Sequence, residues 1–276
     1  MEKEILLKAE SISKSFGGVK ALQNVSFELQ KGEVLSVIGE NGAGKSTLMK
    51  IVAGALKNDE GKIYFQGEEL SLHSPLDAVK TGISIVYQEP NIFADMSVLE
   101  NIFMGNETVS RGGTIQWTKM YDEAVEALRL VGLDGKILHL TMSELSIGNQ
   151  QLVLIARGIY KKCKVLILDE PTSILSHNES EKLFEIIADL KNKGVSIMYI
   201  SHRIPEILRI SDNIIVLRDG CLTGTLSPKE ISEETIITAM SGRKINMSVY
   251  KERKQSEKPI LEVKHLSLKP VYRREF

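Results

Sequence analysis

The stretch that most constrains the fold of this chain is a glycine-rich segment, GENGAGKST, at residues 39–47. It fits the pattern G-x-x-x-x-G-K-[ST] and follows the apolar run Val34 to Ile38, which is typical of a buried parallel strand. Ser46 to Ala53 then carries apolar residues at helical spacing and predicts a helix that ends near Gly54. This order of strand, glycine loop and helix predicts a phosphate-binding site in an α/β domain.

The glycine loop predicts a nucleotide site with a metal ion. Glycines let backbone N–H groups face phosphate oxygens, and the helix that begins near Lys45 adds the positive end of its dipole. Lys45 is expected to reach the β- and γ-phosphates, and the Ser46 hydroxyl to bind Mg²⁺. The alternative is that the segment has no phosphate-binding role and is a glycine turn with a surface lysine. The predicted strand before it and the predicted helix after it disfavour that alternative. The residues expected to bind ATP here are Gly39, Asn41, Gly42, Ala43, Gly44, Lys45, Ser46 and Thr47.

A second chemical element is a pair of carboxylates, Asp169 and Glu170, directly after the apolar run Val165 to Leu168. Ligands collect at the carboxyl ends of parallel strands. Asp169 is expected to bind the metal directly or through water, and Glu170 to deprotonate the attacking water. Taken alone, such a pair is more often a solvated turn. Its combination with the glycine loop favours a functional role over a solvated turn.

The rest of the chain alternates between strand and helix patterns. Strands are predicted at Ile5 to Ala9, Val25 to Leu29, Ile83 to Tyr87, Ser196 to Ile200 and Ile214 to Leu217. A helix is predicted around Ser180 to Lys191, and another over Met120 to Val131 with Thr118 as its N-cap. The second lies in a region, about residues 90–160, where strand signals fade. The pattern predicts a parallel sheet covered by helices, with a helical insertion.

Composition excludes several function classes. The chain has 35 basic and 36 acidic side chains and a net charge of -1, so no bulk positive field draws it to nucleic acid. Its two cysteines, Cys163 and Cys221, lack the spacing of a zinc site or a disulfide framework, which fits a reducing compartment. The apolar runs are far shorter than the ~18 residues of a membrane span, and residues 1–4 lack a signal-peptide pattern. Any membrane role is therefore expected to work through a partner.

Leu145-Ser146-Ile147-Gly148-Asn149-Gln150-Gln151 completes a set of motifs with the glycine loop and the Asp-Glu strand. Over about residues 4–245 the chain resembles the nucleotide-binding subunits of ABC transporters, most of all the first cassette of bacterial monosaccharide importers. The resemblance implies an α/β fold: a P-loop NTPase ABC cassette with a RecA-like core, an antiparallel β subdomain and a helical subdomain at about 90–160, within a domain of residues 1–245. It also implies an ATPase that powers monosaccharide import from the cytoplasmic face of the membrane.

The same resemblance implies roles for single residues. Ser146 and Gly148 would contact the γ-phosphate of an ATP molecule held by the opposite cassette. Phe16 stands where an aromatic ring stacks on adenine, although it can equally be a core residue. Gln88 would sense Mg²⁺ and the attacking water, and His202 would contact the γ-phosphate. The implied catalytic residues are Glu170, His202, Lys45 and Gln88, and the implied metal-binding residues are Ser46, Gln88 and Asp169.

Two features limit the transfer of these roles. Ile147 and Asn149 stand where the general family signature has Gly and Gln, although an isoleucine at that place resembles the sugar importers' first cassette. The segment Glu100 to Phe103 resembles the part that receives the coupling helix of a membrane subunit. Leu99, Ile102 and Phe103 can equally be ordinary core residues. The sequence alone does not decide between a docking role and a core role for these three residues.

Past residue 245 the sequence changes character. Residues 246–258 are polar and charged and predict a linker, and residues 259–276 are interpreted as the start of a second, truncated cassette. The expected partners are a second ABC cassette, the membrane permease subunits and, indirectly, a sugar-binding protein, with no nucleic acid. The alternatives are a soluble ABC ATPase that acts on the ribosome or nucleic acid, and a regulatory module without turnover. The second cassette is inferred because four residues near the end of the chain repeat, at a constant offset, the spacing of four residues near its beginning. These are Leu261, Val263, Leu266 and Ser267, which repeat Leu7, Ala9, Ile12 and Ser13.

Overall fold

The structure is a computed structural model of the 276-residue chain, and it describes residues 4–88, 91–160, 163–241, 264 and 267. Contacts divide the chain into two units, Met1–Arg243 and Lys244–Phe276. All elements described below belong to the first unit. The predicted linker at 246–258 lies outside the described residues, as does nearly all of the predicted second start at 259–276. The predicted domain division therefore stays a prediction.

A six-stranded sheet forms the centre of the first unit. Neighbouring strands are parallel, except for the antiparallel hairpin of the last two strands of the chain. The predicted parallel sheet is thus present, and the carboxyl ends of its parallel strands lie on one edge. In spatial order its strands are β10 (Cys221–Leu226), β9 (Asn213–Arg218), β3 (Val34–Ile38), β8 (Ser196–Ile200), β7 (Val165–Asp169) and β6 (Ile83–Val86).

A four-stranded antiparallel sheet packs beside it. Its order is β2 (Val19–Gln30), β1 (Ile5–Phe16), β4 (Glu60–Phe65) and β5 (Glu68–Glu69). The predicted strands at Ile5 to Ala9 and Val25 to Leu29 were too short. β1 and β2 continue pairing to the register Phe16 to Val19, where both side chains are exposed. An exposed hairpin end has no apolar alternation to reveal it in a sequence.

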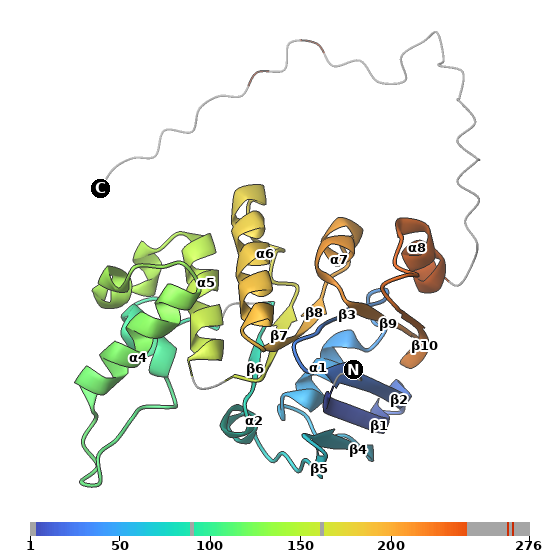
Figure 1. The fold of residues 1–276 in the computed structure, drawn as a ribbon, viewed down its shortest axis with the longest axis horizontal. Coiled ribbons are helices and arrows are strands. Elements are labelled where there is room, and N and C mark those ends of the chain that lie inside the picture. Colours follow the sequence, from blue (N-terminus) through green and yellow to red (C-terminus); the bar gives the residue numbers. More distant parts are fainter. Residues whose placement is uncertain (1–3, 89–90, 161–162, 242–263, 265–266, 268–276) are drawn as a thin grey trace. The chain divides into compact units, whose positions relative to one another are not determined.

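The two faces of the large sheet bury different cores. Successive strand residues alternate between them, as the two-residue period of a strand requires: Val34 and Ile38 pack into one cluster, and Leu35 and Val37 into the other. The second cluster also contains Leu48 of α1 and residues of the small sheet. Helix α1 therefore lies between the two sheets, with the long helices on the opposite face (Figure 1).

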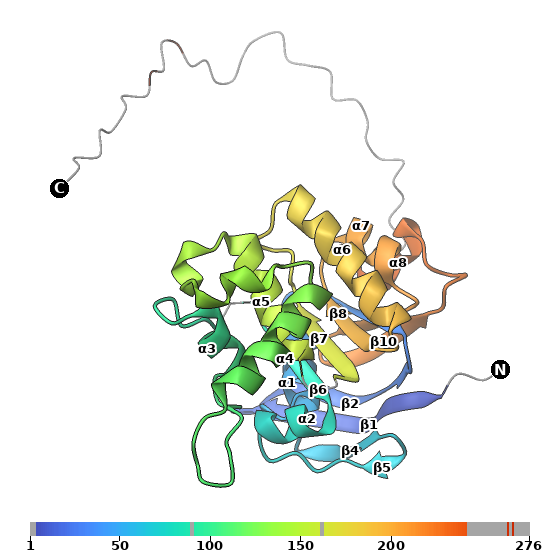
Figure 2. The ribbon, with the colours of Figure 1, turned by 60° about the vertical axis from the view of Figure 1, so that its left-hand side comes forward.

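Helices cover the sheet and build one lobe. Figures 1 and 2 show α6, α7 and α8 on one face of the large sheet, and α3, α4 and α5 together at its β6 end. Within the described part of the chain, no helix has the length and apolarity needed to cross a bilayer. The helices are α1 (Lys45–Val52), α2 (Pro75–Thr81), α3 (Val98–Phe103), α4 (Trp117–Leu130), α5 (Ile147–Ile159), α6 (His177–Asn192), α7 (Ile204–Ile210) and α8 (Glu233–Ser241), with short 3-10 turns η1 (Gly135–His139) and η2 (Met142–Glu144).

The helical lobe agrees with the predicted insertion and corrects two details. Helix α4 begins at Trp117 with Gln116 as its N-cap, so the predicted cap at Thr118 was wrong; Thr118 lies in the first turn. In α3, Ile102 and Phe103 are 1% and 0% exposed, which decides for the core interpretation of both. Leu99 is partly buried against the same core. A surface for a membrane partner must therefore come from other side chains.

Candidate functional site

The glycine loop connects the carboxyl end of β3 to the N-terminus of α1. Its backbone passes so close to neighbouring chain segments that side chains at two of its glycines would clash with them. Gly39 has φ 155°, and a Cβ atom there would lie 2.2 Å from the carbonyl oxygen of Leu217. Gly44, the N-cap of α1, has φ 101°, and its Cβ would lie 2.6 Å from the carbonyl oxygen of Ala21. Both glycines are thus required by conformation and by space. Asn41, Gly42 and Ser46 are exposed on this loop.

Lys45 is buried beneath the loop and holds it. Its Nζ donates hydrogen bonds to the carbonyl oxygens of Gly39 at 2.8 Å and Glu40 at 2.9 Å. Burial lowers the pKa of Lys45, and the nearby carboxylates of Glu170 and Asp169 oppose that shift. The ammonium group is therefore a positive charge with reduced hydration, inside a loop whose N–H groups are the natural partners of phosphate.

Asp169 ends β7 and is 7% exposed. Burial raises its pKa, whereas a hydrogen bond from the Ser46 side chain and the charge of Lys45 lower it. A hydroxyl and a carboxylate thus adjoin at the edge of the sheet beside the glycine loop. These are hard oxygen donors of the kind that bind Mg²⁺ together with water and phosphate oxygens. The residues present therefore fit the implied metal.

Glu170 lies at the centre of a cluster drawn from three strands. Its Oε2 accepts a hydrogen bond from Nε2 of Gln88 at 3.1 Å, and its Oε1 lies 3.1 Å from Nδ1 of His202. Its backbone is left-handed, with φ 45°, and its N–H donates to the carbonyl oxygen of Ile200 at 2.9 Å. Non-glycine residues in this conformation are strained and persist where the surroundings over-determine them, often at functional sites.

The glycine loop and this cluster face one pocket of about 560 Å³. The structure therefore brings together residues that are far apart in the sequence. Glu40 and Met240 were not anticipated: Glu40 occupies a variable place in the motif, and no local signal connects Met240 of α8 with the loop. Phe16, Ser146 and Gly148 do not line this pocket. Its lining residues are Gly39, Glu40, Asn41, Gln88, Glu170, His202 and Met240.

Phe16 ends β1 on the surface and is 48% exposed. The alternative of a core phenylalanine is therefore wrong. The ammonium group of Lys14 lies 5.7 Å from the centre of its ring, within the range of a cation-π contact. An exposed aromatic ring beside a cation is suited to stack on a planar base. Its contact with adenine stays a prediction.

The signature segment begins α5. Ser146 is the N-cap, and its Oγ accepts a hydrogen bond from the N–H of Asn149 at 3.3 Å. Gly148 touches α6: a Cβ atom there would lie 2.0 Å from Oε1 of Glu179, whose pKa is lowered mainly by hydrogen bonds from Ser176 and also by the Gly148 N–H. A side chain at this position would therefore displace the Glu179 side chain of the neighbouring helix. The role of Ser146 and Gly148 toward a second cassette stays a prediction.

A substitution at Gly148 tests this packing. Gly148→Ala is expected to push the Glu179 carboxylate off Ser176, to which it is bonded as a capping box, and to destabilise the fold by about 1 kcal/mol. With Glu179→Ala already present, the same change should instead stabilise by up to about 1 kcal/mol, because alanine favours a helix over glycine. Thermal unfolding of the four proteins measures both effects. An unchanged sign in the two backgrounds would contradict the packing argument.

A comparison of the sequence with protein families matches residues 22–173 to the family described as "ABC transporter", more than half of the chain. The chain belongs to the ABC transporter family. The glycine loop, the signature segment and Glu170 all lie inside the matched range, whereas His202 lies beyond it. The family predicted from the resemblance of the motifs is thereby confirmed.

Curated relatives of this ABC protein cover nearly the whole chain. The ribose import ATP-binding protein RbsA of Caldanaerobacter subterraneus subsp. tengcongensis is 42% identical over 269 residues, which span 98% of this chain and 54% of that protein. The xylose import ATP-binding protein XylG of Geobacillus kaustophilus is 40% identical over 269 residues, spanning 95% and 52%. The chain thus spans about half the length of the curated relatives it matches.

Solved ABC cassettes share the fold. The ADP conformation of MJ1267, an ATP-binding cassette of an ABC transporter, matches with a TM-score of 0.74 and 29% identity over 87% of this chain and 99% of that one. The dimeric bacterial ABC transporter cassette MJ0796 matches with a TM-score of 0.70 and 25% identity over 81% and 99%. The predicted fold class, a P-loop cassette with antiparallel β and helical parts, is confirmed.

Proposed function

We propose that this chain is the part of an ABC importer that binds and hydrolyses ATP to power the uptake of a monosaccharide. The observation that carries the ATPase proposal is the Glu170 carboxylate, positioned by Gln88 and His202 over the pocket that the glycine loop borders. The sugar-import proposal rests on the relatives, which are named ribose and xylose import ATP-binding proteins.

The proposed reaction is the transfer of the terminal phosphoryl group of ATP to water. Glu170 accepts a proton from the attacking water while the water oxygen forms a bond to the γ-phosphorus. The bond between the γ-phosphorus and the β–γ bridging oxygen breaks, and its electron pair leaves with ADP. Gln88 and His202 orient the water and the γ-phosphate, and Lys45 balances the phosphate charge. Mg²⁺ held by Ser46, Asp169 and Gln88 supplies further neutralisation of phosphate charge when bound.

The second proposal concerns completion of the site by another cassette. Ser146 and Gly148 do not line the pocket of Glu170. Ser146 is exposed at the N-cap of the 13-residue helix α5, whose dipole favours an anion, and the Glu179 carboxylate already lies against the Gly148 N–H at this end. We infer that this end contacts ATP held by a second ABC cassette, and that the Glu170 pocket is closed in turn by the signature of that cassette. The neighbour MJ0796 is a cassette solved as a dimer.

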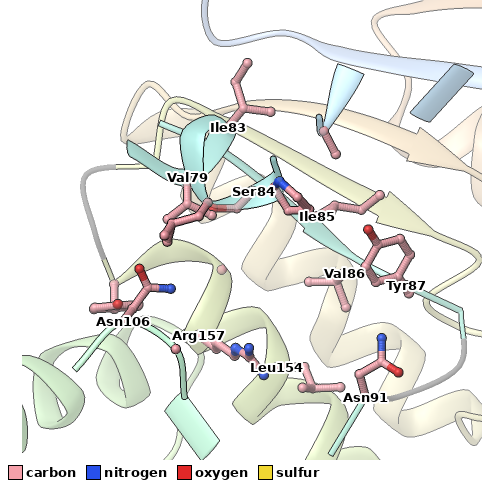
Figure 3. A pocket seen from close by; sticks show the side chains of 16 residues that line it. Val79, Ile83, Ser84, Ile85, Val86, Tyr87, Asn91, Asn106, Leu154 and Arg157 are labelled. Atoms are coloured by element: carbon pink, nitrogen blue, oxygen red, sulfur yellow. The ribbon is translucent and has the colours of Figure 1, made fainter. Parts of the chain in front are cut away.

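A groove beside the helical lobe is the proposed contact for a membrane subunit. It holds about 360 Å³ and is lined by Leu76 and Val79 of α2, Tyr87, and Leu154 and Arg157 of α5, with the walls seen in Figure 3. Burial lowers the pKa of Arg157. An apolar groove with one charged wall suits a short protein segment. The proposal places the chain peripherally at the cytoplasmic face, joined to permease subunits and, through them, to a sugar-binding protein.

The test uses the full-length protein with its membrane subunits in liposomes. ATPase activity is measured while binding protein loaded with ribose, xylose or galactose is added, with unloaded binding protein and a Glu170→Gln transporter as controls. Stimulation by one loaded binding protein and uptake of its sugar would support the proposal. Steady ATPase that no sugar stimulates would contradict sugar import and favour a soluble ABC ATPase that acts on the ribosome or nucleic acid. ATP binding without any turnover would favour a regulatory module.

A further inference from the structure

A buried carboxylate that the proposed reaction does not use lies directly behind the catalytic cluster. It belongs to Glu206, in the first turn of α7, and the residue is 8% exposed. An isolated carboxylate at such a depth is costly, so its hydrogen bonds reveal what holds it there. They come from the loop that follows β7, from β8 itself and from the loop that follows β8, the two loops in which Glu170 and His202 lie.

The bonds converge on both carboxylate oxygens. The hydroxyl of Thr172 lies 2.8 Å from Oε1 and 2.9 Å from Oε2. Oε2 also accepts from the hydroxyl of Tyr199 at 2.8 Å and from Oγ of Ser201 at 2.9 Å, and Arg203 NH1 lies 3.4 Å from Oε1. Thr172, Tyr199 and Ser201 are at most 2% exposed. One carboxylate therefore gathers three buried hydroxyls and a guanidinium group.

Two of these donors adjoin the catalytic residues in the chain. Ser201 precedes His202, and its Oγ also accepts the N–H of Arg203 at 3.0 Å, so both neighbours of His202 are tied to the same network. Thr172 follows Glu170 by two positions, and Glu170 has the strained backbone described above, with φ 45°. A strained residue needs its flanking chain held from outside, and the Thr172 bond to Glu206 does this.

We propose that Glu206 is a positioning residue. It holds the loops that carry His202 and Glu170 in fixed positions relative to each other, so that Nδ1 of His202 and Oε1 of Glu170 stay 3.1 Å apart. The inference rests on the proposed ATP hydrolysis and adds a residue outside the pocket to it. The carboxylate accepts from the hydroxyls of Thr172, Tyr199 and Ser201. Burial raises the pKa of Tyr199, and the Glu206 charge raises it further, which keeps the phenol a donor.

The central test is Glu206→Gln in the full-length protein assembled with its membrane subunits. The amide keeps the size of the side chain but turns one acceptor into a donor that faces hydroxyl groups. A small misplacement of catalytic groups costs up to about a hundredfold in rate, so kcat is expected to fall about tenfold to a hundredfold. The KM for ATP should change by less than about threefold, because the glycine loop is not part of the network. The matched control is Glu181→Gln, a half-buried carboxylate on α6 that is paired with Arg209, which should leave kcat unchanged.

Two further variants separate positioning from general stability. Thr172→Val removes one donor at constant shape and should lower kcat, whereas Thr172→Ser keeps the hydroxyl and should retain it. In a His202→Ala background, Glu206→Gln should add less than about a threefold loss, since residues that act as a unit are not additive. These variants also carry the test if Glu206→Gln does not fold, which a thermal unfolding curve reveals.

The outcomes are distinct. The proposal is supported if Glu206→Gln and Thr172→Val lower kcat while Thr172→Ser does not, and if Glu206→Gln has little further effect on kcat in the His202→Ala background. Normal kcat in Glu206→Gln, or losses that multiply fully with His202→Ala, overturns it while leaving the ATPase proposal intact. An unsubstituted transporter without turnover would overturn the proposed function itself, and the positioning role with it.

Discussion

Replacing Glu170 with glutamine is expected to lower ATP turnover about 10²–10⁴-fold, the range for loss of a general base, with ATP binding retained. Glutamine preserves the size of the side chain but cannot accept the proton of the attacking water. It also loses one of the two acceptors that Gln88 and His202 contact at 3.1 Å. The glycine loop around Lys45 is unchanged, so the affinity for ATP should stay within about threefold. Steady-state ATPase and ATP-binding measurements on the full-length transporter check both numbers.

The control for this variant is Glu185→Gln on α6, an exposed carboxylate that changes the net charge equally. Turnover of the control should match that of the unsubstituted protein. If Glu170→Gln kept turnover near normal, Glu170 would not be the base. The strained backbone at this position would then need another explanation. A loss of ATP binding equal to the loss of turnover would instead point to a role in holding the nucleotide.

Replacing Lys45 with methionine is expected to have the second large effect, on nucleotide binding. A hydrogen bond to a charged group contributes about 1.5–3 kcal/mol, so loss of the ammonium group should weaken ATP binding about tenfold to 150-fold. Nucleotide titration by calorimetry measures the change. Burial lowers the pKa of Lys45, so its charge is costly in the free protein and the apo form should still fold.

Lys57→Met supplies the control for Lys45→Met. Lys57 is exposed just after α1, and its substitution removes the same charge without touching the loop. ATP affinity in this control should be unchanged. Normal ATP affinity in Lys45→Met would mean that the backbone N–H groups alone hold the phosphates. A collapse of the apo fold would mean that its bonds to Gly39 and Glu40 serve mainly to shape the loop.

Much of this site was predictable from short stretches of sequence. The loop from Gly39 to Thr47 is recognisable in the sequence because a phosphate site needs glycines, a lysine and a hydroxyl at fixed spacing. The strand and the helix on either side of it also show clear apolar periodicity. Asp169 and Glu170 follow a continuous apolar run, which indicates the carboxyl end of a buried strand. Local chemistry and local periodicity were enough to predict roles for these residues, and the roles themselves stay predictions. Gln88, His202, Ser146 and Gly148 depended on resemblance, since a single polar residue after a strand carries no signal of its own.

Other features could not be predicted because they depend on contacts between distant segments. In the sequence Glu206 looks like an ordinary helix residue, and only the fold surrounds it with hydroxyl groups from β8 and from the loops after β7 and β8. Met240 reaches the pocket because α8 packs near the carboxyl edge of the sheet. Gly148 lies against Glu179 of another helix. The exposure of Phe16 was open as well, because an aromatic residue fits both a core and a surface until the neighbouring chain is known.

By itself, then, the sequence determined that this chain binds phosphate groups in an α/β domain with carboxylates near the end of a strand, because loop chemistry and apolar periodicity are local properties of the chain. Only the tertiary structure decided which residues meet. The parallel sheet brings the ends of β3, β6, β7 and β8 to one edge, so that Gln88, Glu170 and His202 come within hydrogen-bonding distance. It also decided that Ile102 and Phe103 are core and Phe16 surface. The exposure of these side chains and the proximity of residues far apart in the sequence are set by packing of the whole chain, which their local patterns do not encode.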